Sequence, residues 1–86
     1  METLELFNEK VVCPLCREGG GGSVYSTMLF PINKLVYICD ECEATWLNSE
    51  DVGSNRFFDF TTYVNHLGYQ YQQIKLNDKN YYWYKN

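Results

Sequence analysis

The pattern of apolar and polar residues predicts mainly β-structure in the first half of the chain. Residues 24–29 (VYSTML) and 34–38 (KLVYI) are rich in β-branched and aromatic residues, which favour strands. The intervening residues 30–33 (FPIN) contain proline and asparagine, which are common in tight connections. This arrangement predicts a β-hairpin. Further strands are expected at residues 3–12, which lead into the first cysteine pair, and at residues 44–47, which follow the second.

The period of the apolar residues changes after residue 51. Four apolar residues then recur at intervals of three and four: Phe57, Phe60, Val64 and Leu67. This spacing predicts one face of a short helix. Asn55 and Asp59 are both suited to cap the start of that helix, and Gly68 is suited to end it.

Two interpretations remain open for residues 69–86. The favoured one is a C-terminal hairpin, in which residues 70–76 pair with residues 81–84 (YYWY) across a turn at residues 77–80 (NDKN). The competing one continues the helix through residue 76. In the hairpin, neighbouring aromatic residues point to opposite faces of the strand. One pair then packs inward, and the other forms either an exposed binding stripe or a second buried layer.

The length of 86 residues allows one domain, residues 1–86. A domain of this size buries only about 60–65% of the surface of its unfolded chain, so it usually needs a metal, disulfides or a partner for stability. The pattern predicts a small, β-rich α+β domain of antiparallel strands, with one short helix and a C-terminal hairpin. The sequence has neither a signal-peptide pattern nor a run near the ~20 apolar residues of a membrane span. We therefore expect a cytoplasmic protein that does not contact membranes.

The four cysteines form two pairs with identical spacing. Cys13 and Cys16 flank Pro-Leu, Cys39 and Cys42 flank Asp-Glu, and residues 17–38 separate the pairs. Two residues between paired cysteines allow both thiolates of one turn to bind one ion at Zn–S distances of about 2.3 Å. Cytosolic thiols stay reduced and tend to bind metal. The spacing therefore predicts a structural Zn²⁺ site of the zinc-ribbon type, and the glycines of residues 19–22 absorb the slightly long gap.

Other uses of these cysteines are disfavoured. A redox CxxC pair does not account for a second pair of matching spacing. Iron in a rubredoxin-like site is chemically possible, but Arg17 and Glu43 stand where such sites usually have glycine. Four thiolates leave no position for water or substrate, so catalytic zinc is disfavoured. His66 is the only histidine and has no partner motif for acid–base catalysis, so we expect no enzyme activity.

The second cysteine pair lies in an acidic region. The chain has 11 acidic and 7 basic residues, for a net charge of −4, and residues 36–55 contain no lysine or arginine. This charge argues against nucleic acid as a partner and favours a basic partner. Tyrosine and tryptophan are common anchors of protein interfaces. The candidate partner-binding residues combine both features: Asp40, Glu41, Glu43, Tyr82, Trp83 and Tyr84.

Several segments together resemble a known family. They are residues 13–16 (CPLC), the glycine-rich turn, residues 37–46 (YICDECEATW) and residues 59–63 (DFTTY). They resemble small zinc-ribbon proteins found beside bacterial polymorphic toxin genes, which are similar to immunity proteins of contact-dependent growth inhibition systems. The resemblance covers about residues 11–68. It implies a non-enzymatic protein that binds and neutralises a cognate toxin, commonly a basic nuclease domain.

Two other function classes remain open. One is a zinc-ribbon regulatory or transcription-associated adaptor that recruits protein. The other is a rubredoxin-like electron carrier, which metal analysis and colour would distinguish.

Overall fold

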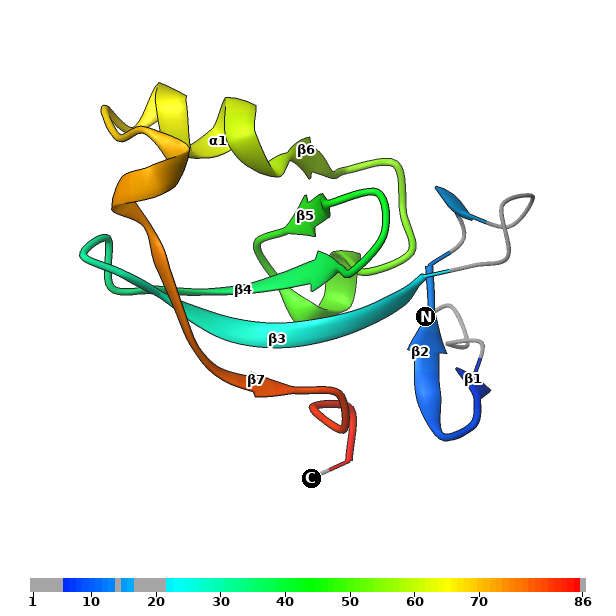
Figure 1. Cartoon of the computed structure of the whole chain (residues 1–86). Coiled ribbons are helices and arrows are strands. Elements are labelled where there is room, and N and C mark those ends of the chain that lie inside the picture. Colours follow the sequence, from blue (N-terminus) through cyan, green and yellow to red (C-terminus); the bar gives the residue numbers. More distant parts are fainter. Residues whose placement is uncertain (1–5, 14, 17–21, 86) are drawn as a thin grey trace.

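A long β-hairpin forms the centre of the structure. The computed structural model describes residues 6–13, 15–16 and 22–85. Within it, β3 (Ser23–Phe30) pairs antiparallel with β4 (Lys34–Cys39), from Val24 opposite Cys39 to Leu29 opposite Lys34. The turn between them is closed by a hydrogen bond from the Asn33 amide to the Leu29 carbonyl, and Asn33 has a positive φ of 64°. The predicted hairpin is therefore confirmed (Figure 1).

The N-terminal region is a second hairpin instead of the single strand that was predicted. Its strands are β1 (Leu6–Phe7) and β2 (Lys10–Val12), and β2 pairs with the start of β3. Asn8 and Glu9 form the turn with φ values of 53° and 66°. Positive φ at both central residues is typical of the tight turns that join adjacent strands. Residues 3–5 of the predicted strand lie outside the described residues.

The other side of the central hairpin carries the remaining short elements. The predicted strand after the second cysteine pair is present as β5 (Ala44–Trp46), which pairs with β4 and with β6 (Phe58–Asp59). A 3₁₀ helix, η2 (Ser49–Asp51), lies in the connection between β5 and β6. In Figure 1, β6 and the following helix lie on one side of the hairpin, opposite the C-terminal strand.

The predicted helix is present as α1 (Phe60–His66). Asp59, not Asn55, caps it, since the Asp59 carboxylate accepts hydrogen bonds from the amide and hydroxyl of Thr62 at 3.1 and 3.2 Å. Gly68 follows the helix with φ 95°, as expected of a terminating glycine. The predicted apolar face is only half buried. Two of its four residues, Phe60 and Val64, are buried, whereas Phe57 precedes the helix and Leu67 is exposed at its end.

The C-terminal hairpin prediction is wrong, and so is the competing helix. A 3₁₀ helix, η3 (Tyr71–Gln73), is followed by a single strand, β7 (Lys75–Asn80), which pairs antiparallel with β3. The residues expected to form a turn therefore lie in the strand, where Asp78 has φ 58° near a register shift. Residues 81–84 form a turn. Because β2 pairs only with the start of β3, the rest of that edge is free to accept β7.

The apolar side chains form two clusters, because successive residues of a strand point to opposite faces. The first cluster contains Val11, Cys13, Val24, Cys39, Ala44, Trp46 and Val52. The second cluster contains Tyr25, Leu29, Val36, Ile38, Phe60 and Val64. Two of the four cysteines are thus core residues of the first cluster. Within the described residues, no helix is long and apolar enough to cross a membrane.

Candidate metal centre

The structure brings the four predicted cysteines together. Cys13 follows β2, Cys39 ends β4, and their Sγ atoms and those of Cys16 and Cys42 all lie within 4.8 Å of one another. The Sγ atoms of Cys13 and Cys42 are 3.7 Å apart, and those of Cys16 and Cys39 are 3.4 Å apart. Four sulfurs around one Zn²⁺ at 2.3 Å would be about 3.8 Å apart. The arrangement therefore fits a single metal ion with four thiolate ligands.

The second cysteine turn is held by hydrogen bonds to sulfur. Cys39 Sγ accepts hydrogen bonds from the amides of Glu41 and Cys42 at 3.4 and 3.5 Å. The Glu43 amide donates to the Cys39 carbonyl at 3.2 Å. Glu43 has φ 63°, so it adopts the left-handed conformation of the glycine that usually follows the second cysteine of a rubredoxin-like turn. The geometry is thus formed without the glycine.

Gly22 is part of the site, whereas the sequence predicts only that the glycine run bridges the long gap between the two cysteine pairs. Its carbonyl accepts a hydrogen bond from the Cys13 amide at 3.0 Å. A Cβ atom at Gly22 would lie 2.5 Å from Cys39 Sγ and 2.8 Å from Glu41 Cβ, which is too close for any side chain. The run of glycines was the available signal, but it does not say which glycine approaches the sulfur. Glycines 19–21 lie outside the described residues.

The two cysteine turns place one sulfur deep and one nearer the surface. Cys13 and Cys39 are fully buried, Cys16 is half-buried and Cys42 is exposed. Burial raises the pKa of the Cys13 thiol and raises that of Cys39 to about 11. Burial also acts to raise the pKa of Cys16, but hydrogen bonds with Cys42 and Cys39 lower it overall. Buried thiolates need a compensating positive charge, which a divalent cation between the four sulfurs would supply.

The predicted acidic contact residues differ in their hydrogen bonds and in their exposure to solvent. The two carboxylate oxygens of Asp40 accept hydrogen bonds from the Ser23 amide and the Tyr81 hydroxyl, both at 2.9 Å. Asp40 therefore links the cysteine turn to β3 and the C-terminal turn. Glu41 is exposed and Glu43 is half-buried.

The predicted aromatic contact residues also divide into two kinds. Tyr82 is 44% exposed, whereas Trp83 and Tyr84 are half-buried against the first cluster. The Trp83 indole donates a hydrogen bond to the Val24 carbonyl at 3.0 Å, and the Tyr84 hydroxyl donates to the Glu9 carbonyl. Trp83 and Tyr84 thus attach the C-terminal turn to the core and to the N-terminal hairpin.

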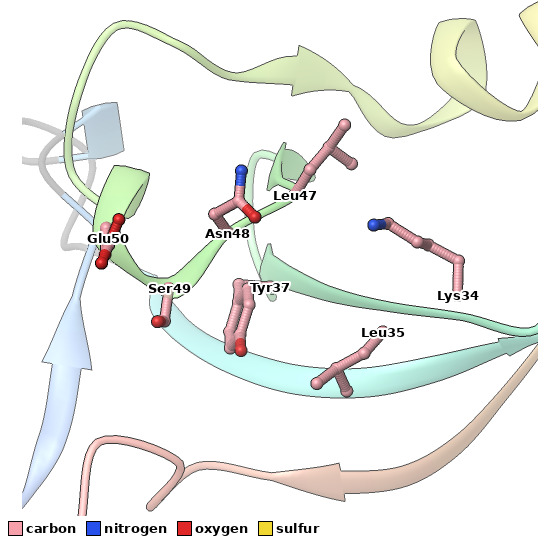
Figure 2. A pocket seen from close by; sticks show the side chains of 7 residues that line it. All are labelled: Lys34, Leu35, Tyr37, Leu47, Asn48, Ser49 and Glu50. Atoms are coloured by element: carbon pink, nitrogen blue, oxygen red, sulfur yellow. The ribbon is translucent and has the colours of Figure 1, made fainter.

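A shallow depression of about 430 Å³ lies apart from the cysteines, along β4 and the segment from Leu47 to Glu50 of η2. Figure 2 shows Lys34 and Glu50 at its opposite ends, with Leu35, Tyr37 and Leu47 between them. His66 is exposed in the last turn of α1. Neither the four cysteines nor His66 are among the residues that line the depression.

Comparisons with protein-family models, curated proteins and solved structures gave no match to this chain.

Proposed function

We propose that the four cysteines bind one structural Zn²⁺ and that the chain is a non-enzymatic protein that neutralises a toxin domain, as an immunity protein does. The observation that carries the metal assignment is the cluster of four Sγ atoms within 4.8 Å. Four thiolate ligands fill the coordination shell of zinc and leave no open position for a reacting water. A site of this kind stabilises a fold, which favours a binding role over a catalytic one.

The surface beside the second cysteine turn supports a basic partner. Ala44 in β5 lies opposite Asp59 in β6, so the Glu43 end of β5 and the capping carboxylate of α1 are neighbours. With Glu41, which is exposed two residues before Glu43 in the same segment, they give this part of the chain an acidic character. Complementary charge raises the association rate with a basic domain.

Exposed aromatic rings lie next to this acidic region. Phe57 and Phe58 are 39% and 46% exposed, and Phe58 pairs with Thr45 in β5. The Phe57 ring packs beside Trp46 and the Phe58 ring beside Tyr63, at centroid distances of 6.1 and 5.8 Å. Supported rings of this kind suit an interface anchor. We therefore propose Phe57 and Phe58, together with Tyr82, as the aromatic residues that contact the partner, in place of the half-buried Trp83 and Tyr84.

The proposal requires a toxin gene beside this one, and the test is binding to the toxin domain that it encodes, measured as association kinetics and as rescue of growth when both proteins are expressed. We expect association to slow as salt rises, because added ions screen charges beyond a Debye length of about 8–10 Å. Glu41→Lys should slow association, whereas Glu50→Lys, an exposed acidic residue of η2, should change it less.

Three results would overturn this proposal. Growth that is not rescued and no binding to the toxin domain would exclude the immunity role. Tight binding to a transcription protein instead would favour the adaptor. A coloured protein that contains iron would favour the electron carrier.

A further inference from the structure

The four sulfurs of the candidate metal centre differ in two properties that control their reactivity. The first is access, since Cys42 is exposed whereas Cys16 is half-buried and Cys13 and Cys39 are fully buried. The second is hydrogen bonding from the backbone. Cys39 Sγ accepts two amide hydrogen bonds, whereas Cys42 Sγ accepts none from the part of the chain that the structure describes.

These two properties act in the same direction. An amide that donates to a metal-bound sulfur withdraws electron density from it, so a sulfur without such a bond keeps more of its nucleophilicity. A solvent-exposed thiolate can also be reached by a dissolved electrophile, whereas a buried one cannot. Cys42 therefore combines the greatest access with the least hydrogen bonding.

We infer that Cys42 is an oxidant-sensitive modification site, at which a peroxide disassembles the metal centre. The inference rests on the proposed binding of zinc. In the first step, the Cys42 thiolate attacks one oxygen of hydrogen peroxide, the O–O bond breaks, and hydroxide leaves; Cys42 becomes a sulfenic acid. The sulfur gives up two electrons in this step, and the peroxide takes both.

The second step uses a sulfur on the other cysteine turn that lies at contact distance. Cys13 Sγ lies 3.7 Å from Cys42 Sγ. The Cys13 thiolate attacks the sulfenyl sulfur of Cys42, a disulfide bond forms, and a second hydroxide leaves. The two cysteines are then no longer thiolate ligands, and only Cys16 and Cys39 remain to hold zinc. Because Cys13 is also a core residue of the first cluster, the change extends into the fold.

The experiment starts from the full chain purified with zinc, whose content is established by elemental analysis. Protein without zinc would refute the metal assignment itself, which is a different failure from the one tested next. The zinc-loaded protein is treated with equimolar hydrogen peroxide. Released zinc is followed with a chromogenic chelator, and oxidised cysteines are located by peptide mass spectrometry. In parallel, substoichiometric iodoacetamide labels the most reactive thiolate.

We expect iodoacetamide to label Cys42 more than about tenfold faster than any other cysteine, and peroxide to produce a Cys13–Cys42 disulfide as zinc is released. Equal labelling of the four cysteines, or first labelling of Cys16, would overturn the inference. This comparison needs no variant, so it is independent of any folding defect.

A matched pair of histidine variants tests the cause. Three cysteines and one histidine also bind structural zinc, so Cys42→His and Cys16→His each keep a four-ligand site. Cys42→His should release zinc more than about tenfold more slowly with peroxide than the unchanged protein, and Cys16→His should release it at a similar rate. Equal rates for the two variants would show that Cys42 is not the point of attack.

Discussion

At the scale of single residues, the arrangement of the four cysteines depends on two other backbone positions. Gly22 brings the chain against Cys39 Sγ, with no room for a Cβ atom. Glu43 adopts a left-handed conformation that a residue with a side chain adopts only at a cost. One position already has the residue that its geometry requires, and the other does not. Substitutions at the two positions should therefore have opposite effects.

Gly22→Ala should weaken zinc binding. The added methyl group would overlap the Cys39 sulfur and Glu41 Cβ, so one of them must move. Overpacking of this kind costs about 1–3 kcal/mol, which corresponds to an affinity loss of about 5- to 150-fold. Competition with a calibrated chelator measures it. Gly68→Ala is the control, because the alanine would be strained at φ 95° while its Cβ atom would have no atom of a non-neighbouring residue within 4 Å. Because zinc binding and folding are coupled, that variant should lower the apparent zinc affinity only through its strained backbone and by less than Gly22→Ala does, and an equal or larger loss would contradict the steric explanation.

Glu43→Gly should stabilise the zinc-loaded protein by about 0.5–1 kcal/mol, because glycine adopts the left-handed conformation without a steric penalty. The backbone hydrogen bonds of residue 43, including that from the Phe60 amide to its carbonyl, are unaffected by the substitution. Denaturant unfolding in the presence of zinc provides the measurement. Glu41→Gly removes the same charge from an exposed position two residues earlier and should not stabilise. A destabilised Glu43→Gly protein would show that the carboxylate matters more than the backbone.

At the scale of secondary structure, the elements that the sequence predicts well are those with local causes. The β3–β4 hairpin follows from two strand-forming runs and a short connection, and α1 follows from its apolar spacing, its Asp59 cap and Gly68. The cysteine cluster is also predictable, because the spacing of the two pairs indicates which sulfurs come together. The structure confirms the proximity of these sulfurs, whereas the identity of the metal stays a prediction.

The strand β7 could not be predicted in the same way, because it forms in response to another strand that is distant in the chain. The residues 77–80 have the composition of a turn, yet they form part of β7 because β3 offers an unpaired edge beyond β2. The polar sequence suits this place, since β7 is largely exposed and polar edge strands resist further pairing. Local propensity does not contain that information.

The C-terminal turn at residues 81–84 should contribute to stability through Trp83. Its indole donates to the Val24 carbonyl, and its ring packs at 4.8 Å from that of Tyr37. Trp83→Ala should lower the free energy of unfolding by about 2–3 kcal/mol, somewhat less than the loss of a fully buried tryptophan. The exposed Tyr82 next to it is the control, and Tyr82→Ala should cost less than about 0.5 kcal/mol. Denaturant melts of both variants make the comparison, and equal losses would mean that the turn is not anchored by Trp83.

At the scale of the whole molecule, the cysteines join parts of the fold that are distant in the chain. Cys13 follows β2, whereas Cys39 ends β4 and Cys42 lies in the turn between β4 and β5. Cys13 and Cys39 also contribute to the first cluster, together with buried Trp46 and the ring of Trp83. A metal ion there would cross-link the end of β2 to the end of β4. It would also fix the position of the first cluster. The second cluster contains no cysteine and lies on the other side of β3.

Removal of the metal should therefore unfold the domain as a unit. A chain of 86 residues has too small a core for the second cluster to persist alone, and binding of structural zinc supplies about 10 kcal/mol or more to small domains. Because both tryptophans pack in the first cluster, their fluorescence should shift to that of exposed indole when a strong chelator is added. The far-ultraviolet circular dichroism of strands and α1 should be lost over the same chelator range, and both signals should return with added zinc. Loss of the tryptophan signal with unchanged circular dichroism would show instead that the two clusters fold independently and that the metal stabilises only one of them.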